Sequence, residues 1–416
     1  MTKKIMTSKK VTDILLFVSI GVFLFGSGYK IGEYNTQHTT KSQSSYTIRN
    51  TEPKVSQKAQ DVDFSLFWDT WDKVEQKYVD KKKLDTKKMV YGAIKGMVAS
   101  LDDPYTFFLT PDENKQSKDD LGGKFEGIGA QLGLKDNRIV IIAPLKDSPA
   151  EKAGVKPGDY VVKVDGQSTN GWKLPQAVSK IRGNKGTKVT ITFERNEKTF
   201  DLNIVRDQIN VSSVDLSYEK QIAYLKLSQF GENTNREWDK ATTEIANKWD
   251  KKEIKGMVLD LRDNPGGYLE SAVFTASDFL SQGKLIVRQE STTTENVDYE
   301  VERQGKLLNI PLVVLINKGS ASASEILSGA LRDYGRAKLV GEKSFGKGSV
   351  QEALDLNSGA GLHVTVAKWI LPKGDWIMGK GIEPSIKVDL ITKEGETITK
   401  DTDNQLQRAF EEVLKQ

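Results

Sequence analysis

The feature that most constrains the fold is an apolar run, residues 310–316, followed directly by a turn and three serines. The run is IPLVVLI, and a continuous apolar run of this length is typical of a strand buried on both faces. Ser320, Ser322 and Ser324 stand at alternate positions after the turn. The next apolar residues recur with the spacing of an amphipathic helix: Ala323, Ile326, Leu327, Ala330 and Leu331. The sequence therefore predicts a strand, a turn and a helix, with Ser322 at the start of the helix.

Ser322 is a candidate nucleophile, because the first amide groups of a helix lack partners and can stabilise an oxyanion. Capping of the helix is the simpler role for each of the three serines. A nucleophilic serine also needs a base. The chain has only two histidines, His38 in a polar segment and His363 in a strand-like pattern, so a Ser-His-Asp triad is disfavoured.

Lys347 is the candidate base, because glycines frame it in the sequence Phe-Gly-Lys-Gly and lysine can also activate a serine. A lysine base must be neutral near pH 7, so burial has to lower its pKa by roughly 3 units. Gln351 follows shortly after and is a candidate to orient Lys347 or Ser322. The simpler alternative for Lys347 is a solvated loop lysine.

A phosphate-binding loop is a further alternative, since residues 341–347 have the G-x4-G-K spacing. Such a loop requires Ser or Thr at the next position and a helix after it. Here Gly348 comes next, and the following run SVQEALDL has the pattern of a strand. The nucleotide-binding alternative fails on both counts.

The segments GSASASEI and FGKGSVQ resemble those of the carboxyl-terminal processing proteases, which are tail-specific serine peptidases with a Ser-Lys dyad. The resemblance implies that Ser322 is the nucleophile and Lys347 the base, with Gln351 beside them. It also implies an α/β serine-protease core, α+β with a mixed sheet and similar to the crotonase and Clp-protease folds. No metal or organic cofactor is implied.

The turn DLRDNPGG also resembles the family, in which it supplies one oxyanion donor while the amide after the nucleophile supplies another. These donors correspond here to the backbone of Gly266 or Gly267 and of Ala323. A plain turn into a helix is the alternative for the two glycines. Asp333 and Arg336 match family positions as well, and we interpret them as structural support.

Residues 119–207 combine short strand patterns, glycine turns and a helix, and the sequence SPAEKAGVKPGDYVVKVDGQ resembles a PDZ domain. The loop before it resembles the loop in which PDZ domains bind a C-terminal carboxylate, while the peptide adds as a strand beside AQLGL. The loop residues are Gly127, Ile128, Gly129 and Ala130.

A helix near residues 174–181 has one apolar face, on which Leu174 and Val178 are candidates to bind the last side chain of a substrate. Arg182, just after this helix, is a candidate to pair with the carboxylate of the substrate or to couple the PDZ domain to the active site. A solvated arginine at the end of a helix is the alternative.

The start of the chain, MTKKIMTSKK, has four lysines and no acid, which equals the net charge of +4. The rest is therefore near neutral and offers no electrostatic case for nucleic-acid binding. The apolar segment from Ile14 to Tyr29 predicts a single transmembrane helix, with the lysine-rich side in the cytoplasm. No small-residue cleavage site follows it, so we expect an uncleaved anchor, with a cleaved signal peptide as the alternative.

The location outside the cytoplasm agrees with the absence of cysteine, which excludes disulfides and thiol catalysis. Aromatic and apolar residues at helical spacing follow a polar linker and predict either an intrachain core or a dimer-forming helix: Phe64, Phe67, Trp68, Trp71, Val74 and Tyr78. Near the C-terminus an amphipathic helix is expected to pack in a dimer or on the core through Leu406, Phe410 and Leu414.

The sequence thus predicts a membrane-anchored, extracytoplasmic serine endopeptidase that recognises the C-terminal tails of proteins. The alternative is a catalytically silent, anchored PDZ adaptor, and the intact set of Ser322, Lys347 and Gln351 argues against it. The expected organisation is a basic start and anchor at 1–33, a linker at 34–60, a helical region at 61–118, a PDZ domain at 119–207, a peptidase core at 208–395 and a helical tail at 396–416.

Overall fold

The structure is a computed structural model that describes residues 63–145, 147–391 and 398–416. The chain divides into two compact units, residues 1–84 and 85–416. In the first unit, the described elements are α2 (Ser65–Lys77) and the 3-10 turn η2 (Lys81–Lys83). Every residue of α2 is at least partly exposed, so its aromatic stripe does not form a buried core within the described residues.

The expected anchor, Ile14 to Tyr29, and the linker at 34–60 lie outside the described residues. No helix within the described ranges combines the length and the apolar character that crossing a membrane requires.

The second unit contains a six-stranded core sheet in which β10 and β11 are antiparallel and all other neighbours are parallel. The predicted mixed sheet is therefore confirmed. Its strands, in spatial order, are β10 (Val214–Glu219), β11 (Ile222–Leu227), β12 (Gly256–Asp260), β15 (Leu312–Ile316), β16 (Lys338–Gly341) and β19 (Ile386–Lys387).

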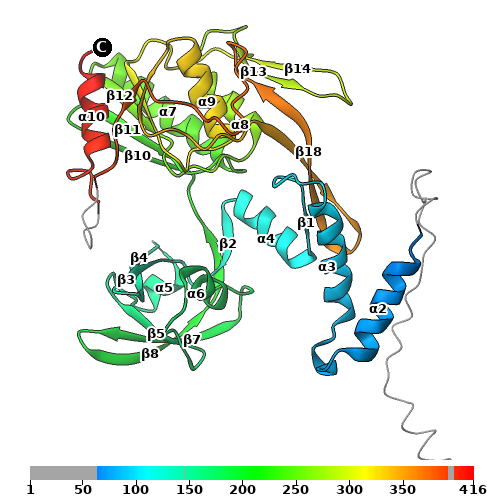
Figure 1. Ribbon diagram of the computed structural model, residues 1–416. Helices are drawn as coiled ribbons and strands as arrows, with labels where there is room; N and C mark the ends of the chain where they lie inside the picture. The colour runs from blue at the N-terminus through cyan, green and yellow to red at the C-terminus, as the bar shows by residue number, and fades with distance from the viewer. Residues whose placement is uncertain (1–62, 146, 392–397) are drawn as a thin grey trace, which may run out of the picture. The chain divides into compact units, whose positions relative to one another are not determined.

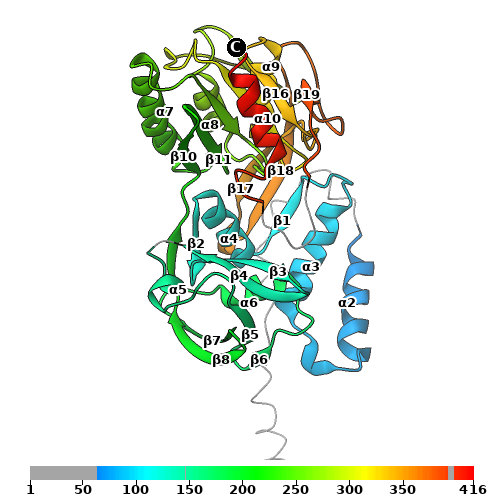
Figure 2. The same ribbon diagram turned by 90° about the vertical axis from the view of Figure 1, so that its left-hand side faces the viewer.

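Helices cover both faces of this sheet (Figures 1 and 2). On one face lie α7 (Thr234–Asp250), α8 (Leu269–Ala276) and α9 (Ala323–Asp333), and on the other lies α10 (Asn404–Val413). Because successive side chains of a strand point to opposite faces, β15 supplies Leu312 and Val314 to one core and Val313 and Leu315 to the other. This double burial explains why the run 310–316 is apolar throughout.

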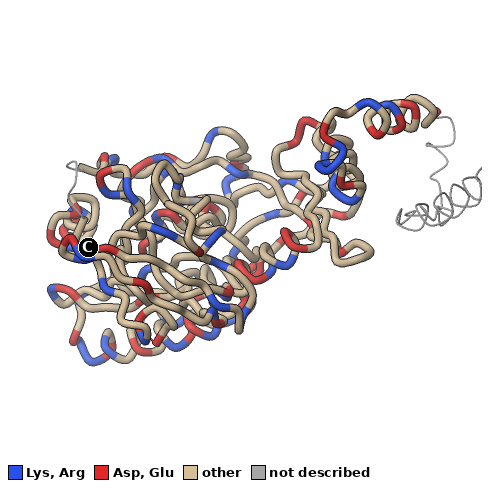
Figure 3. The backbone as a smooth tube through the Cα atoms, turned by 90° about the horizontal axis from the view of Figure 1, so that it is seen from below, with Lys and Arg blue, Asp and Glu red and all other residues tan. Residues whose placement is uncertain are grey.

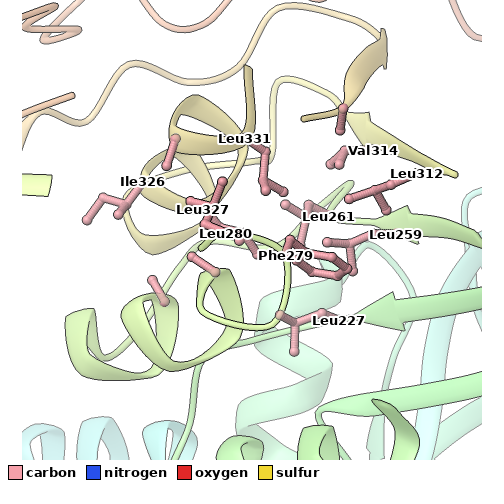
Figure 4. Packing of buried hydrophobic residues seen from close by; sticks show 14 of the residues in the cluster. Leu227, Leu259, Leu261, Phe279, Leu280, Leu312, Val314, Ile326, Leu327 and Leu331 are labelled. Carbon is pink, nitrogen blue, oxygen red and sulfur yellow. The ribbon is translucent and has the colours of Figure 1, made fainter. Parts of the chain in front are cut away.

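The larger core is packed between α8, α9 and the central strands (Figure 4). Leu327 and Leu331 of α9 are fully buried there, against Leu259 of β12 and Val314 of β15. The helical spacing of its apolar residues thus fixes which face of α9 points inward, and with it the direction in which the helix start faces.

On the other face, α10 buries Leu406 and Phe410 against the core sheet. The prediction that the tail packs on the core is therefore confirmed for these two residues. It is wrong for Leu414, which is the C-cap of α10 and is 54% exposed. Val413 takes its place in the core, because the inward stripe of the helix passes through that residue instead.

A second sheet is antiparallel throughout and has the order β1-β18-β13-β14, with β17 also paired to β18. Through β1 this sheet joins the segment before the predicted PDZ domain to the predicted peptidase core. Its strands are β1 (Phe107–Leu109), β13 (Leu285–Glu290), β14 (Val297–Glu300), β17 (Ser349–Asp355) and β18 (Gly361–Ile370), with the turn η3 (Asn357–Gly359) between the last two.

Two helices flank β1, namely α3 (Thr86–Ala99) and α4 (Pro111–Leu121). The start of α4 is fixed by a capping box: the Glu113 amide donates to the Thr110 hydroxyl, and the Glu113 carboxylate accepts from the Thr110 amide. Pro111 occupies the first helical position, where its missing N–H costs nothing.

The PDZ domain is bracketed by β2 (Lys124–Gly127) and β9 (Asp207–Asn210), which pair with each other where the chain passes into and out of it (Figure 1). Its sheet has β3 at one edge and β8 at the other. The elements are β3 (Ala130–Lys135), β4 (Arg138–Pro144), α5 (Pro149–Lys152), β5 (Tyr160–Val164), β6 (Gln167–Ser168), α6 (Leu174–Ile181), β7 (Lys188–Arg195) and β8 (Lys198–Val205).

Candidate active site

Ser322 lies at the turn between β15 and α9, as the sequence predicts, and it is the N-cap residue of the helix. Its backbone has φ 55° and ψ −116°, a conformation that residues with a Cβ rarely adopt. Such strained positions persist only where the surroundings enforce them, and they are concentrated at active sites. The strain thus singles out Ser322 from its two neighbouring serines.

Ser320 and Ser324 have structural roles instead. Their hydroxyls donate to the carbonyls of Leu261 and Asn264 at 2.8 and 2.9 Å, and both side chains are fully buried. These bonds tie the segment around Ser322 to the turn that follows β12. Neither serine caps α9, so the prediction that Ser320 or Ser324 caps the helix is wrong; the N-cap is Ser322, which alone of the three serines remains partly exposed.

The glycine turn after β12 lies directly against Ser322. A Cβ on Gly266 would lie 2.8 Å from the Ser322 Cβ, and a Cβ on Gly267 would lie 2.1 Å from the Phe230 carbonyl oxygen. Both glycines also have positive φ, 101° and 138°. Close approach and backbone conformation together require glycine at both positions, which a plain turn would not.

The amides of this turn have different partners. Gly266 N donates to the Asn264 side-chain oxygen at 2.9 Å, so that amide is already engaged. Among the hydrogen bonds of the described residues, none has the Gly267 or the Ala323 amide as its donor. Gly266 and Ala323 approach each other closely, since a Cβ on Gly266 would lie 3.0 Å from the Ala323 nitrogen. The Ala323 amide, which follows Ser322, and the Gly267 amide, which follows Gly266, are therefore both without an acceptor among the described hydrogen bonds.

Glu325, one turn into α9, connects the nucleophile segment to the lysine segment. Its carboxylate accepts from the Ser322 amide at 2.9 Å and from the Lys347 amide at 3.0 Å. It also accepts from Gly346 N at 2.7 Å and from Ser344 Oγ at 2.5 Å. Glu325 is fully buried, and burial raises its pKa even though these hydrogen bonds oppose the rise.

The glycines that frame Lys347 are explained by the segment that covers them. A Cβ on Gly346 would lie 2.8 Å from the Gly381 nitrogen, and a Cβ on Gly348 would lie 2.8 Å from the Met378 nitrogen. The indole of Trp376 donates to the Gly348 carbonyl at 2.8 Å. Lys347 is thus held in a loop packed on both sides, and is not a solvated loop lysine.

The side chain of Lys347 is partly buried, and this burial lowers the pKa of its ammonium group. The charges of Asp103 and Glu325 oppose that shift. The ammonium nitrogen lies 5.2 Å from the ring centroid of Tyr105. A lowered pKa is the property that a lysine needs to act as a base near neutral pH.

Gln351, on β17, donates to Ser349 Oγ at 2.8 Å and to Thr365 Oγ1 at 3.2 Å. It lies on the strand that leaves the lysine loop, and its amide contacts these hydroxyls rather than Ser322 or Lys347 in the described bonds. Its predicted orienting role stays a prediction.

Asp333 and Arg336 support the fold, as expected. Asp333 is buried and accepts from Arg332, while Arg336 donates to the carbonyls of Phe279, Leu307 and Ile310. Within the described ranges, no group of three or more His, Asp or Glu side chains is arranged to hold a metal ion.

In the PDZ domain, the predicted carboxylate loop runs from Gly127, at the end of β2, to Ala130, at the start of β3. Gly129 has φ 72°, and a Cβ there would lie 2.5 Å from the Ser148 Cβ, so only glycine fits. The side chain of Ile128 is buried in the PDZ core and can offer a ligand only its backbone.

A pocket of about 590 Å³ lies between α4, β2 and α6, and Leu174, Val178 and Arg182 line it. The loop 127–130 does not contribute to its lining. The Arg182 guanidinium stacks on the ring of Phe125 at 4.7 Å and pairs with Asp120 of α4 at 3.2 Å. Arg182 is therefore not simply a solvated helix-end arginine.

Sequence reasoning missed two residues of the site, Glu325 and Asn264. A signal for Glu325 was present, because Ser322 and Glu325 have the spacing of a capping box, in which an acidic residue bonds back to the helix start. Asn264 was part of the quoted turn, but only the structure reveals that its side chain occupies the amide of Gly266.

Comparison with known proteins identifies the family of the chain. Residues 221–388 match Peptidase family S41, residues 140–195 match the PDZ domain, and residues 23–113 match the Activating protease CtpB N-terminal domain. Carboxy-terminal processing protease CtpA of Bacillus subtilis is 41% identical over 77% of this chain and 69% of its own length. Carboxy-terminal processing protease CtpB of the same organism is 36% identical over 90% of this chain and 77% of its own length.

Solved structures give a matching fold. A putative S41 protease from Bacteroides fragilis superposes with a TM-score of 0.55 at 15% identity, over 81% of this chain and 95% of that chain. At this identity the match supports the fold alone. The family models and the two Bacillus relatives lead to one conclusion: the chain belongs to the carboxy-terminal processing proteases of peptidase family S41, and it is a serine endopeptidase with a PDZ domain.

Proposed function

We propose that the peptidase acts through a Ser322-Lys347 dyad, is anchored in the membrane, and selects substrates by their C-terminal tails. The observation that carries the dyad is the Glu325 carboxylate, which accepts hydrogen bonds from the amides of both Ser322 and Lys347. A buried carboxylate shared in this way fixes the two segments relative to each other. Reacting groups need such fixed geometry to react efficiently.

In this mechanism Ser322 Oγ attacks the carbonyl carbon of the scissile peptide bond while neutral Lys347 takes the hydroxyl proton. The amides of Gly267 and Ala323 are the proposed donors to the oxyanion, because Gly266 N is engaged by Asn264. Lys347 then protonates the leaving amine, and an acyl-enzyme on Ser322 remains. Water hydrolyses this ester, again with Lys347 as the base.

Tail recognition rests on the PDZ domain. β3 is an edge strand of its sheet, so a peptide can add alongside it through main-chain hydrogen bonds. The amides of residues 127–130 are the proposed ligands of the terminal carboxylate, and Leu174 and Val178 the proposed contacts of the last side chain. Arg182, which pairs with Asp120, lines the same pocket as Leu174 and Val178, and we call this pocket the PDZ groove.

The proposed location is the cell membrane, with one N-terminal span and the bulk of the protein on the extracytoplasmic side. The support is the apolar segment from Ile14 to Tyr29, flanked by lysines. Away from that start, the charges of the described chain are mixed in sign (Figure 3). Fractionation of cells followed by N-terminal sequencing distinguishes an anchored chain from a cleaved, secreted one.

A homodimer is proposed through α2, whose aromatic rings cluster at its surface: the ring centroids of Phe67, Trp68 and Trp71 are 5.0 to 6.3 Å apart. Rings that stay exposed in one chain can become buried when two copies associate. Sedimentation of the full chain with and without Trp68→Glu tests this, and a monomer in both cases contradicts it.

The central test is cleavage of a flexible protein with an apolar C-terminus by the full chain. Ser322→Ala and Lys347→Ala should each lower the rate to background, about 10³-fold or more. Removing one member of a catalytic unit costs nearly as much activity as removing the whole unit. Full activity in either variant contradicts the dyad. Binding of tails without turnover by the wild type would instead support the adaptor, an alternative that the family assignment does not favour.

A further inference from the structure

The segment Asp103-Pro104-Tyr105-Thr106, just before β1, is fastened beside the lysine loop. The Thr106 hydroxyl accepts from the Thr365 amide of β18 at 3.0 Å and donates to the Asp103 carboxylate at 2.6 Å. The Tyr105 amide donates to the same carboxylate at 3.0 Å. The next residues pair with β18 as strand β1. Neither Asp103 nor Tyr105 has a part in the mechanism above.

The side chains of Asp103 and Tyr105 both influence the charge state of Lys347. The ammonium nitrogen lies 5.2 Å from the Tyr105 ring centroid, within the range of a cation–π contact. The Asp103 carboxylate is held next to this ring by the Tyr105 amide and the Thr106 hydroxyl. Burial alone would raise the pKa of Asp103, but hydrogen bonds and the charge of Lys347 lower it, and the charge of Asp103 in turn opposes the lowering of the Lys347 pKa by burial.

Four titratable groups face Lys347 from the elements around it. They are Asp103 and Tyr105 from the segment before β1, Glu325 from α9, and His363 from β18. Burial and the charge of the neighbouring Lys347 lower the pKa of His363, whose ring stacks on that of Phe107 with the centroids 4.7 Å apart. Glu325 is committed to four hydrogen bonds. Asp103 is the negative charge that an asparagine can remove while its side-chain oxygen still accepts from the Tyr105 amide.

We propose that Asp103 and Tyr105 are positioning residues that favour the ammonium form of Lys347, so that this segment sets the pH above which the peptidase is active. The physical reason is that a carboxylate and the face of an aromatic ring both attract a cation, whereas neither attracts a neutral amine. The inference rests on the proposed function of Lys347 as the general base. It assigns a role to a segment far from Lys347 in the sequence.

The first experiment measures kcat/KM against pH for the full chain, with a flexible protein substrate. In Asp103→Asn the acidic limb should move to lower pH, so that the rate below the limb rises about threefold to tenfold while the plateau changes little. The matched control is Asp102→Asn, the same chemical change at an exposed neighbour, which should leave the profile unchanged. A limb that moves to higher pH in Asp103→Asn overturns the proposal, and so does a limb that stays in place together with an unchanged titration of Lys347.

Two variants of Tyr105 separate the ring from its hydroxyl. Tyr105→Phe keeps the aromatic face and should reproduce the wild-type limb, whereas Tyr105→Leu should move the limb to lower pH. Equal profiles for Tyr105→Leu and the wild type contradict the role of the ring. These variants also keep the proposal testable if Asp103→Asn disturbs folding, since they leave the Asp103 hydrogen bonds in place.

A second readout does not depend on catalysis. In the Ser322→Ala background, the rate at which a small amine-reactive reagent labels Lys347 is followed against pH by mass spectrometry. Adding Asp103→Asn should move this titration to lower pH, and an unchanged titration overturns the inference. If labelling shifts but the pH profile of proteolysis does not, Asp103 does control Lys347 while the proposed role of Lys347 as the base is wrong. The two failures are thus distinguishable.

Discussion

Glu325 in the active site and Arg182 in the PDZ groove are both charged side chains at the end of a helix, but their surroundings differ. Glu325 is fully buried and accepts four hydrogen bonds from two segments of the chain, the start of α9 and the loop 344–347. Arg182 has a side chain 33% exposed, and its ion pair is with Asp120, whose side chain is 48% exposed. A buried, fully bonded carboxylate is costly to disturb, whereas an exposed pair contributes little to stability. The hydrogen bonds of Glu325 therefore hold the active site in one conformation, whereas Arg182 in the PDZ groove can exchange Asp120 for another partner at little cost in free energy.

Glu325→Gln should have the largest effect. The glutamine amide would present its NH₂ group to N–H donors that now face a carboxylate oxygen, leaving at least one buried donor unsatisfied. We expect a loss of about 3 kcal/mol in unfolding free energy and a fall in kcat of about 100-fold. Thermal unfolding and turnover measure the two effects.

The matched control for this change is Glu383→Gln, which removes an exposed pair with Lys343. It should change stability by less than about 0.5 kcal/mol. If the two substitutions lower the unfolding free energy equally, the contrast between the buried hydrogen bonds of Glu325 and the exposed ion pairs is wrong.

Gly266→Ala should come next, chiefly in kcat. Its Cβ would lie 2.8 Å from both the Ala321 carbonyl oxygen and the Ser322 Cβ, so the turn or the nucleophile has to move. A displacement of about 1 Å in a catalytic group can lower the rate about 100-fold. Gly374→Ala is the control, because that glycine also has positive φ, 89°, but open space around it. A similar loss of kcat in both would attribute the effect to backbone strain rather than to contact with Ser322.

The sequence was sufficient to predict those elements whose structure is determined by one local pattern. The apolar run before Ser322 predicted β15, and the helical spacing after it predicted the inward face of α9. The glycines before and after Lys347 singled out this lysine as the candidate base, and the close contacts of Gly346 and Gly348 explain why glycine stands at both positions.

What the sequence could not give are contacts between distant segments. No local pattern indicates that Glu325 bonds to Lys347, or that Tyr105 lies over the same lysine, because those neighbours exist only after β1 and β18 have paired. The same limit explains Leu414. Three apolar residues at helical spacing predicted one face, but the orientation of α10 on the core sheet decides which of them is buried.

Asp403→Asn tests a largely buried ion pair. Asp403 caps α10 through the Leu406 amide at 2.9 Å and pairs with Arg262, which follows β12 just before the glycine turn. Asparagine keeps the cap but removes the charge. We expect a loss of about 1 to 2 kcal/mol in stability and a decrease of a few-fold in kcat. Asp401→Asn, at an exposed position in the same segment, should change neither. Equal values for both variants would mean that α10 does not support the turn.

The smallest effect on stability, and the most informative for the groove, is expected from Asp120→Asn. Loss of an exposed pair should cost less than about 0.5 kcal/mol. The freed Arg182 lines the pocket beside α6, so it becomes available to the carboxylate of a substrate tail. We therefore expect KM to fall about threefold for a peptide with a free C-terminus and to stay unchanged for the same peptide amidated.

Asp119→Asn, in the same pocket, is the control. An equal fall in KM for both peptides would show that Arg182 acts on something other than the tail, and the groove would then owe its selectivity to the backbone of residues 127–130.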